Sequence, residues 1–127
     1  MKDLSWKILS SEYLFKEMWC TVRKDTCEMQ DGKIITPYYV YEFPTWVTAV
    51  AVTTDGKIIL ERQYRHGLQQ TNYETPGGCV DATDANFQDA IARELLEETG
   101  YAFDNYEYLG KTSCNPSTNN NWMHIFF

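Results

Sequence analysis

Three glutamates in the last third of the chain are the feature that most restricts its fold and chemistry. Residues 93–101 read RELLEETGY, so Glu94, Glu97 and Glu98 project from one face if this segment is helical. Their charges repel, and Gly100 is suited to end the helix just beyond them, where the helix dipole is already negative. Each placement costs roughly a few tenths of a kcal/mol unless a cation offsets it. Converging carboxylates of this kind suit Mg²⁺ or Mn²⁺.

The simpler interpretation of an E-x-x-E-E pattern is a solvated acidic face of a helix. Two features of the surrounding sequence favour the metal site. The Pro-Gly-Gly turn at residues 76–78 lets backbone approach a ligand closely. The opposite side of the predicted helix carries an apolar stripe that we expect to be buried, made of Phe87, Ala90, Ile91 and Leu95.

Composition and charge narrow the class of protein. The 127 residues are enough for a sizeable core, and 43% hydrophobic and 15% aromatic content argues against a disordered chain. The net charge is −7, and no cluster of lysines or arginines is present. Both facts argue against nucleic acid or an anionic membrane as a partner. An acidic protein that binds phosphates would need a metal ion between its own negative charges and those of the phosphates.

The cysteines predict a reduced environment. Cys20, Cys27, Cys79 and Cys114 form no C-x-x-C pair and have no histidine at zinc-ligand spacing. The first residues have no apolar run of signal-peptide length, and no segment approaches eighteen apolar residues. We therefore expect a soluble, cytoplasmic protein.

The order of predicted strands and turns suggests two regions. Residues 1–45 read as strands in a small antiparallel sheet, with a turn at 30–32 and an edge position at Pro37. Residues 46–54 and 57–64 predict a hairpin closed by a two-residue Asp-Gly loop of type I′. The first strand of that hairpin is apolar on both faces, as in a central strand covered by helices on both sides.

Two more strands are expected after the helix, near 106–113 and at 122–127, with a polar loop between them. The apolar run 124–127 ends the chain without a cap, turn or polar tail. We expect the chain to be a fragment of a longer domain; the alternative is a natural edge strand at the C-terminus.

Residues 93–101 resemble the second half of the Nudix box, R-E-U-x-E-E-x-G-U, where U is aliphatic or aromatic. The first half departs from the family pattern. Fourteen residues separate Gly78 from Arg93 where the pattern has thirteen, and Asp84 stands where it has glutamate. We expect the extra residue to be absorbed between Asp84 and Asn86, where a polar side chain could cap the helix.

Other motifs resemble the ADP-ribose and ADP-sugar pyrophosphatase branch of this family. They are the Gln-Tyr-Arg of 63–65, the E-x-P-G-G of 74–78, the β-rich stretch before Trp46 and the position of Pro116. The resemblance implies a Nudix-type α/β/α sandwich with a mixed sheet over 46–127, incomplete at its C-terminus. It also implies that residues 1–45 form a sheet that can exchange between the subunits of a homodimer.

The resemblance implies specific roles for residues of the acidic helix and the glycine turn. Glu94 and Glu98 would bind the metal together with the carbonyl of Gly77. Glu97 would be a further ligand or would assist the base, and Arg93 would orient the glutamates. In this branch, an acidic residue from a loop beyond the last strand seen here helps to activate water.

The resemblance also implies substrate contacts, each with a plainer alternative. Arg65 would contact the diphosphate, or else be an ordinary surface arginine. Trp46 or Tyr38 could stack on the base, or else belong to the core. Pro116 lies at the spacing of a proline associated with ADP-ribose specificity.

The expected activity is Mg²⁺- or Mn²⁺-dependent hydrolysis of a small nucleoside diphosphate derivative, ADP-ribose or an ADP-sugar first. The products would be a nucleoside monophosphate and a sugar phosphate. The alternatives are a catalytically weak module that senses a nucleotide sugar, and a nucleoside triphosphate pyrophosphatase.

Overall fold

The computed structural model describes residues 3–127, which form two compact units. The first unit runs to Phe43 and also includes Ser113–Asn121; the second comprises Pro44–Thr112 and Trp122–Phe127. Whether 1–45 and 46–127 are separate domains stays a prediction.

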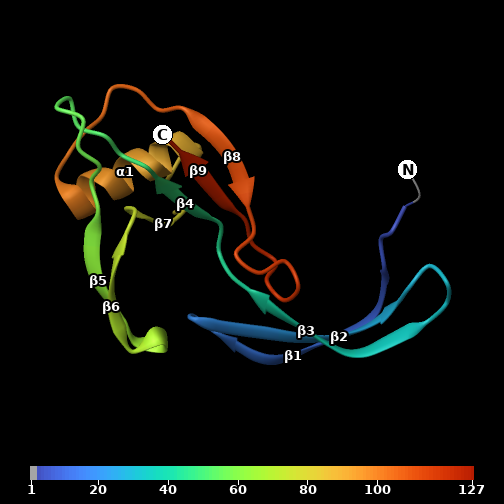
Figure 1. The fold of residues 1–127 in the computed structure, drawn as a ribbon. Coiled ribbons are helices and arrows are strands. Elements are labelled where there is room, and N and C mark those ends of the chain that lie inside the picture. Colours follow the sequence, from blue (N-terminus) through green and yellow to red (C-terminus); the bar gives the residue numbers. More distant parts are fainter. Residues whose placement is uncertain (1–2) are drawn as a thin grey trace. The chain divides into compact units, whose positions relative to one another are not determined.

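The first unit is built on an antiparallel sheet of order β1-β2-β3 (Figure 1). Its strands are β1 (Lys7–Glu17), β2 (Cys20–Glu28) and β3 (Ile34–Glu42). This confirms the predicted N-terminal antiparallel sheet, and Pro37 lies in the edge strand β3, as expected. The segment Ser113–Asn121 attaches to β3, because the Tyr41 N–H donates to the Thr118 carbonyl at 2.7 Å.

The second unit contains a mixed four-stranded sheet of order β7-β4-β9-β8. β4 pairs in parallel with β9, whereas β7 and β8 join antiparallel, and this confirms the mixed α/β class. A separate antiparallel pair, β5-β6, precedes β7. The elements are β4 (Trp46–Ala49), β5 (Glu61–Arg65), a 3-10 turn η1 (His66–Leu68), β6 (Gln70–Glu74), β7 (Gly77–Cys79), α1 (Phe87–Thr99), β8 (Tyr108–Thr112) and β9 (Met123–Phe126).

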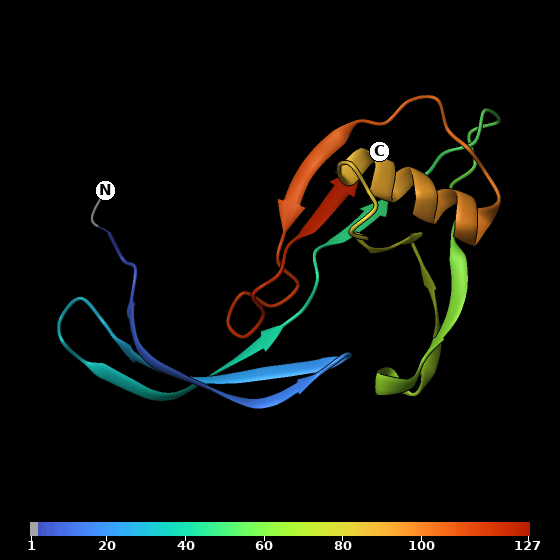
Figure 2. The ribbon, with the colours of Figure 1, turned by 180° about the vertical axis from the view of Figure 1, so that it is seen from behind.

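Helix α1 lies across one face of the four-stranded sheet (Figure 2). Its apolar stripe packs on inward-facing residues of β4 and β9, in a core of Val47, Ala49, Ala51, Ala90, Ile91, Leu95 and Phe126. The opposite face of β4 is only half-buried, and α1 is the single α-helix within residues 3–127. The sequence predicted helices on both sides of β4. In the described part of the chain, a helix covers only one side.

The prediction for Phe87 was wrong in part. Its side chain remains 40% exposed, whereas the other members of the stripe are buried. Phe87 is the first residue of α1, so it lies at the rim of the packed face. There its ring stacks on that of His124, with centroids 3.7 Å apart.

The predicted hairpin of residues 46–64 was also wrong in its extent and register. A tight turn is present, but the Thr53 N–H donates to the Lys57 carbonyl and Val52 bridges Ile58. This pairing leaves three residues in the loop instead of two. Beyond it the strands separate, because β4 is paired on both edges by β7 and β9, and β5 pairs with β6.

Helix α1 is capped by Asn86, one of the polar residues that the sequence left open for this role, and ends at Gly100, as expected. The Asn86 side chain accepts the Asp89 N–H at 2.9 Å, and Gly100 ends the helix in the left-handed conformation with φ of 74°. All four cysteines are free, as expected. No helix in the described part of the chain has the length and apolar character that crossing a membrane requires.

Replacing Asn86 with alanine should destabilise the protein by about 1 kcal/mol, because the first turn of α1 loses its side-chain acceptor. Chemical denaturation of Asn86→Ala against the wild type measures this change. Asn86→Asp keeps the acceptor and should retain most of the stability. Equal stability of Asn86→Ala and the wild type would contradict the capping role.

Candidate functional site

The acidic face of α1 meets the glycine strand β7. One carboxylate oxygen of Glu98 accepts the backbone N–H of Gly77 at 2.8 Å. The Glu94 carboxylate lies against Gly78 so closely that a Cβ there would be 2.6 Å from its Oε1. Only glycine permits this approach, so the Pro-Gly-Gly turn brings backbone and carboxylates together.

Arg93 holds the acidic face and the preceding loop together. Its guanidinium donates to both carboxylate oxygens of Asp84, at 3.0 and 2.9 Å, and to the Cys79 carbonyl at 3.0 Å. It also pairs with Glu94 at 2.9 Å and with Glu97 at 3.2 Å. These acceptors, the Asp84 carboxylate first, raise the pKa of Arg93 above its ordinary value. The arginine therefore stays charged and fixes the orientation of two glutamates.

The segment between β7 and α1 forms a turn held by its own aspartate side chains. The Asp81 N–H donates to the Asp84 carboxylate at 2.7 Å, and the Thr83 N–H donates to the Asp81 carboxylate at 2.9 Å. The Asp84 side chain is 5% exposed. The glycine strand β7 pairs with β4 in a regular register, without a bulge.

Asp84→Asn should lower stability at neutral pH, and the deficit should shrink in acid. The hydrogen bonds from Arg93 lower the pKa of the Asp84 carboxyl below its ordinary value of 3.8. The stabilising contribution is therefore complete above pH 3.8 and is lost as pH falls through the lower folded-state pKa. Denaturation at a series of pH values measures the difference between the two proteins. A deficit that stays constant below pH 3.8 would contradict this.

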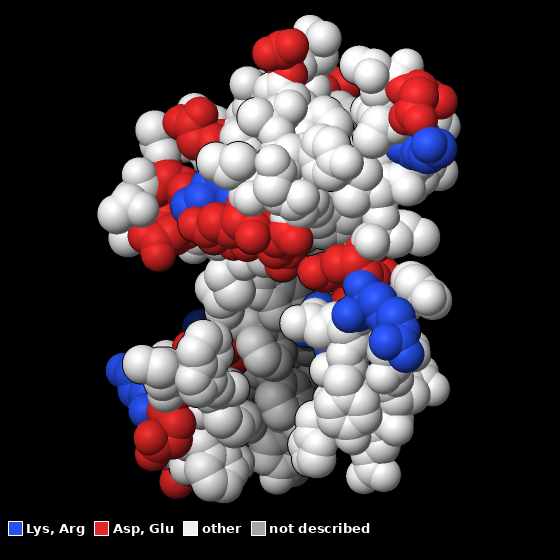
Figure 3. Space-filling model, turned by 90° about the vertical axis from the view of Figure 1, so that its left-hand side faces the viewer, with Lys and Arg blue, Asp and Glu red and all other residues white. Residues whose placement is uncertain are grey.

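Negative charge from three elements surrounds the glycine turn. Burial raises the pKa of Glu98, and the nearby carboxylates of Glu61 and Glu94 add to this effect. Burial also raises the pKa of Glu61 in β5, with Glu74 and Glu94 contributing. Figure 3 displays a face that carries a row of Asp and Glu side chains. This electrostatic environment favours a cation.

The donor set fits a hard divalent cation held in an open site. Within residues 3–127, no three His, Cys, Asp or Glu side chains form a closed metal cage. Mg²⁺ does not require one, because it keeps several waters and binds through one or two carboxylates plus substrate phosphates. Glu94 and Glu98 supply such carboxylates beside the backbone of Gly77.

The remaining predicted residues lie in three different places. Arg65, in β5, is bound to the Glu74 carboxylate by three hydrogen bonds of 2.7–3.1 Å, and its side chain is 46% exposed. Trp46 pairs with Cys79 in the four-stranded sheet. Pro116 belongs to the Ser113–Asn121 segment of the first unit, whereas the glutamates belong to the second. Sequence reasoning did not identify Glu61, whose position depends on the β5-β6 pairing.

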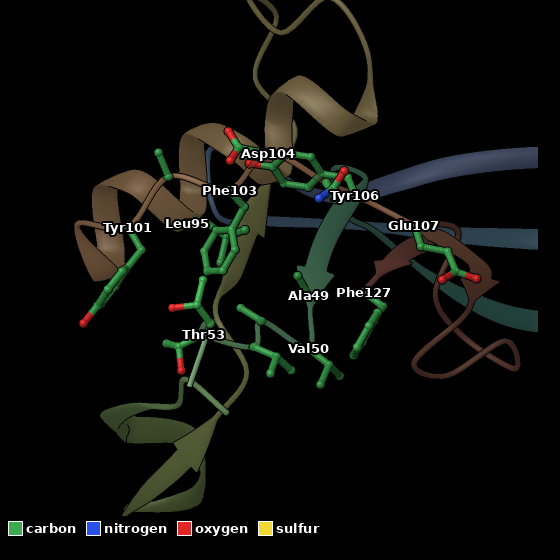
Figure 4. A pocket seen from close by; sticks show the side chains of 15 residues that line it. Ala49, Val50, Thr53, Leu95, Tyr101, Phe103, Asp104, Tyr106, Glu107 and Phe127 are labelled. Carbon is green, nitrogen blue, oxygen red and sulfur yellow. The ribbon is translucent and has the colours of Figure 1, made fainter. Parts of the chain in front are cut away.

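A cavity of about 580 Å³ in the second unit lies elsewhere (Figure 4). Its lining consists mainly of Ala49–Thr54 and Tyr101–Glu107, with Leu95 and Phe127. None of the three α1 glutamates lines it. Because the cavity is largely apolar and none of the α1 glutamates lines it, the chemistry is assigned to the acidic face.

Two family models match the chain. Residues 6–41 match the nucleoside diphosphate sugar hydrolase N-terminal domain, and residues 44–127 match the NUDIX domain.

Curated relatives are similar over nearly the whole chain. The ADP-ribose pyrophosphatase of Bacillus subtilis (strain 168) is 29% identical over 126 residues, which cover 99% of this chain and 67% of that protein. The methanol dehydrogenase activator of Bacillus methanolicus is 27% identical over 94% of this chain and 64% of that protein. The ADP-ribose pyrophosphatase of Mycobacterium tuberculosis (strain ATCC 25618 / H37Rv) is 28% identical over 99% and 60%. The chain thus spans about 60–67% of the length of these relatives.

A solved structure is similar as well. The crystal structure of an ADP compounds hydrolase aligns with a TM-score of 0.84 and 28% identity. The alignment covers 99% of this chain and 68% of that one.

Proposed function

The chain belongs to the Nudix hydrolase family, and on this basis we propose that it hydrolyses the diphosphate of a nucleoside diphosphate linked to another moiety. ADP-ribose or an ADP-sugar is the first candidate, with a nucleoside monophosphate and a sugar phosphate as products. The observation that carries the proposal is the docking of the Glu94 and Glu98 carboxylates on the glycine strand. A substrate's phosphates would complete the coordination of a cation there.

Roles are proposed for the residues of the acidic face and the glycine strand. Glu94, Glu98 and the Gly77 carbonyl would hold Mg²⁺ or Mn²⁺, and Glu97, whose side chain is 60% exposed, would be a further ligand or assist the base. Arg93 would keep the glutamates oriented through its ion pairs. A bound divalent cation would neutralise charge that develops on the diphosphate and lower the pKa of an attacking water.

Substrate contacts are proposed for three further residues. Arg65 would exchange one or more of its bonds with Glu74 for phosphate oxygens, because its guanidinium fork matches both kinds of acceptor. Trp46 would stack on the base, and Pro116 would help to select the sugar-bearing substrate. The ADP-linked names of the relatives and of the solved hydrolase support this substrate class.

A substrate panel tests the proposed class of reaction. Purified protein with Mg²⁺ is incubated with ADP-ribose, ADP-glucose, dinucleotides and nucleoside triphosphates, and the products are separated by chromatography. We expect a nucleoside monophosphate and a sugar phosphate from the ADP-sugars. Faster release of pyrophosphate from the triphosphates would instead indicate a nucleoside triphosphate pyrophosphatase.

We also propose a cytoplasmic homodimer that binds no nucleic acid. The four free cysteines agree with a reducing compartment, and the net charge of −7 disfavours nucleic acid. Large apolar side chains of the first unit are exposed, among them Phe15 at 58%, Met18 at 86% and Trp19 at 82%. Exposed apolar surface of this kind is typical of a subunit interface.

A further inference from the structure

Glu61 is the carboxylate around the glycine turn that lacks a partner. Glu74 is paired with Arg65, Glu94 with Arg93, and Glu98 accepts the Gly77 N–H. By contrast, no hydrogen bond or ion pair joins the Glu61 carboxylate to any residue in the described range 3–127, and the Arg65 guanidinium attracts it only through its charge. It is nevertheless partly buried. Partial burial of an unpaired carboxylate is costly unless a cation compensates it.

The strand pairing places Glu61 beside the acidic face of α1. In the β5-β6 pair, Glu61 lies directly opposite Glu74, three residues before Gly77. Glu61 therefore lies on the strand pair that leads directly into the backbone on which Glu98 docks. The charges of Glu61 and Glu94 act on each other, as do those of Glu61 and Glu98.

Strand β5 carries charges of both signs on one face. Glu61 and Arg65 are four residues apart, and side chains at even spacing in a strand project to the same side. The Glu74 carboxylate repels Glu61 and attracts Arg65. Arg65 and Glu61 also attract each other. The strand therefore offers a carboxylate for a cation near β7 and a guanidinium for phosphate farther along.

We propose that Glu61 is a positioning residue of the cation site, which strengthens divalent cation binding by its charge and acts through water instead of direct coordination. This inference rests on the proposed function, because it assigns a further residue to the same site. Outer-sphere action agrees with the lack of a three-residue metal cage in the described residues. It makes the site depend on β5 as well as on α1.

Calorimetric titration with Mn²⁺ tests the proposal. Glu61→Gln should bind Mn²⁺ roughly threefold to tenfold more weakly, the effect expected when one unit charge near a divalent cation is removed in a water-like dielectric. Glu61→Asp keeps the charge and should recover most of the affinity. The matched control is Glu107→Gln, an exposed glutamate next to β8, at the sheet edge opposite β7, which should bind Mn²⁺ like the wild type.

Two further readouts separate a charge effect from a structural one. The affinity difference should shrink in high salt, which screens the interaction between charges. The melting temperature of Glu61→Gln in EDTA should not fall, because the substitution removes an unpaired charge. Wild-type Mn²⁺ affinity in Glu61→Gln, or weakening in Glu61→Asp equal to that in Glu61→Gln, would overturn the proposal. No Mn²⁺ binding by the wild type would instead overturn the proposed function.

Discussion

Replacing Glu98 with glutamine should reduce metal-dependent hydrolysis roughly 10²- to 10³-fold while the protein remains folded. A bound cation contributes several kcal/mol of transition-state stabilisation, and each 1.4 kcal/mol is about tenfold in rate. The amide oxygen of glutamine can still accept the Gly77 N–H that Glu98 accepts at 2.8 Å. Steady-state rates with ADP-ribose over a range of Mg²⁺ concentrations measure the loss.

Two features of this variant make its result easy to interpret. Burial raises the pKa of Glu98, so the folded protein disfavours the ionised form, and the neutral glutamine should not lower stability. Glu107→Gln, far from the acidic face, should keep wild-type rates and serves as the control. A stable Glu98→Gln protein with wild-type activity would exclude the assignment of this site.

Replacing Gly77 with alanine should destabilise the protein by about 3 kcal/mol or more. A Cβ at this position would lie 2.2 Å from the Val47 carbonyl oxygen and 2.7 Å from the Thr48 Cα, and φ is 153°. Both obstacles are backbone atoms of the central strand, so the β4-β7 pairing must shift to admit a methyl group. Urea denaturation of Gly77→Ala against the wild type measures the loss.

Gly78→Ala provides a matched comparison with a different expected outcome. Its Cβ would meet the Glu94 carboxylate, which is the far end of a flexible side chain and can move away. We therefore expect a folded protein with weakened Mn²⁺ binding, because Glu94 is displaced from the glycine turn. Equal loss of stability in the two alanine variants would show that the two glycines do not differ in this way.

Local patterns were sufficient to predict helix α1 and the shared face of its glutamates. The apolar stripe, two candidate capping residues and the terminal Gly100 all lie within a short stretch of sequence. The structure places the cap at Asn86 and the end at Gly100. The spacing of the three glutamates then predicted that their side chains share one face of the helix. The pairing of Asp84 with Arg93 was not predicted, although the two residues are only nine positions apart in the chain.

Long-range strand pairing was not predictable from local sequence. The Asp-Gly dipeptide favoured a long hairpin of 46–64, but both edges of β4 are taken by β7 and β9, which lie far along the chain. As a result, β5 pairs with β6, and Glu61 faces Glu74 instead of the end of β4. Because a hairpin was predicted over this region, the position of Glu61 beside the acidic face was not predicted.

The most direct test of the central claim is product analysis of ADP-ribose mixed with the wild-type protein. Calorimetry with Mg²⁺, followed by chromatography of the cell contents, reports binding and turnover in one sample. We predict AMP and ribose phosphate in equal amounts, and no products when EDTA replaces Mg²⁺. Heat of binding with ADP-ribose recovered intact would contradict the hydrolase proposal and identify a nucleotide-sugar sensor.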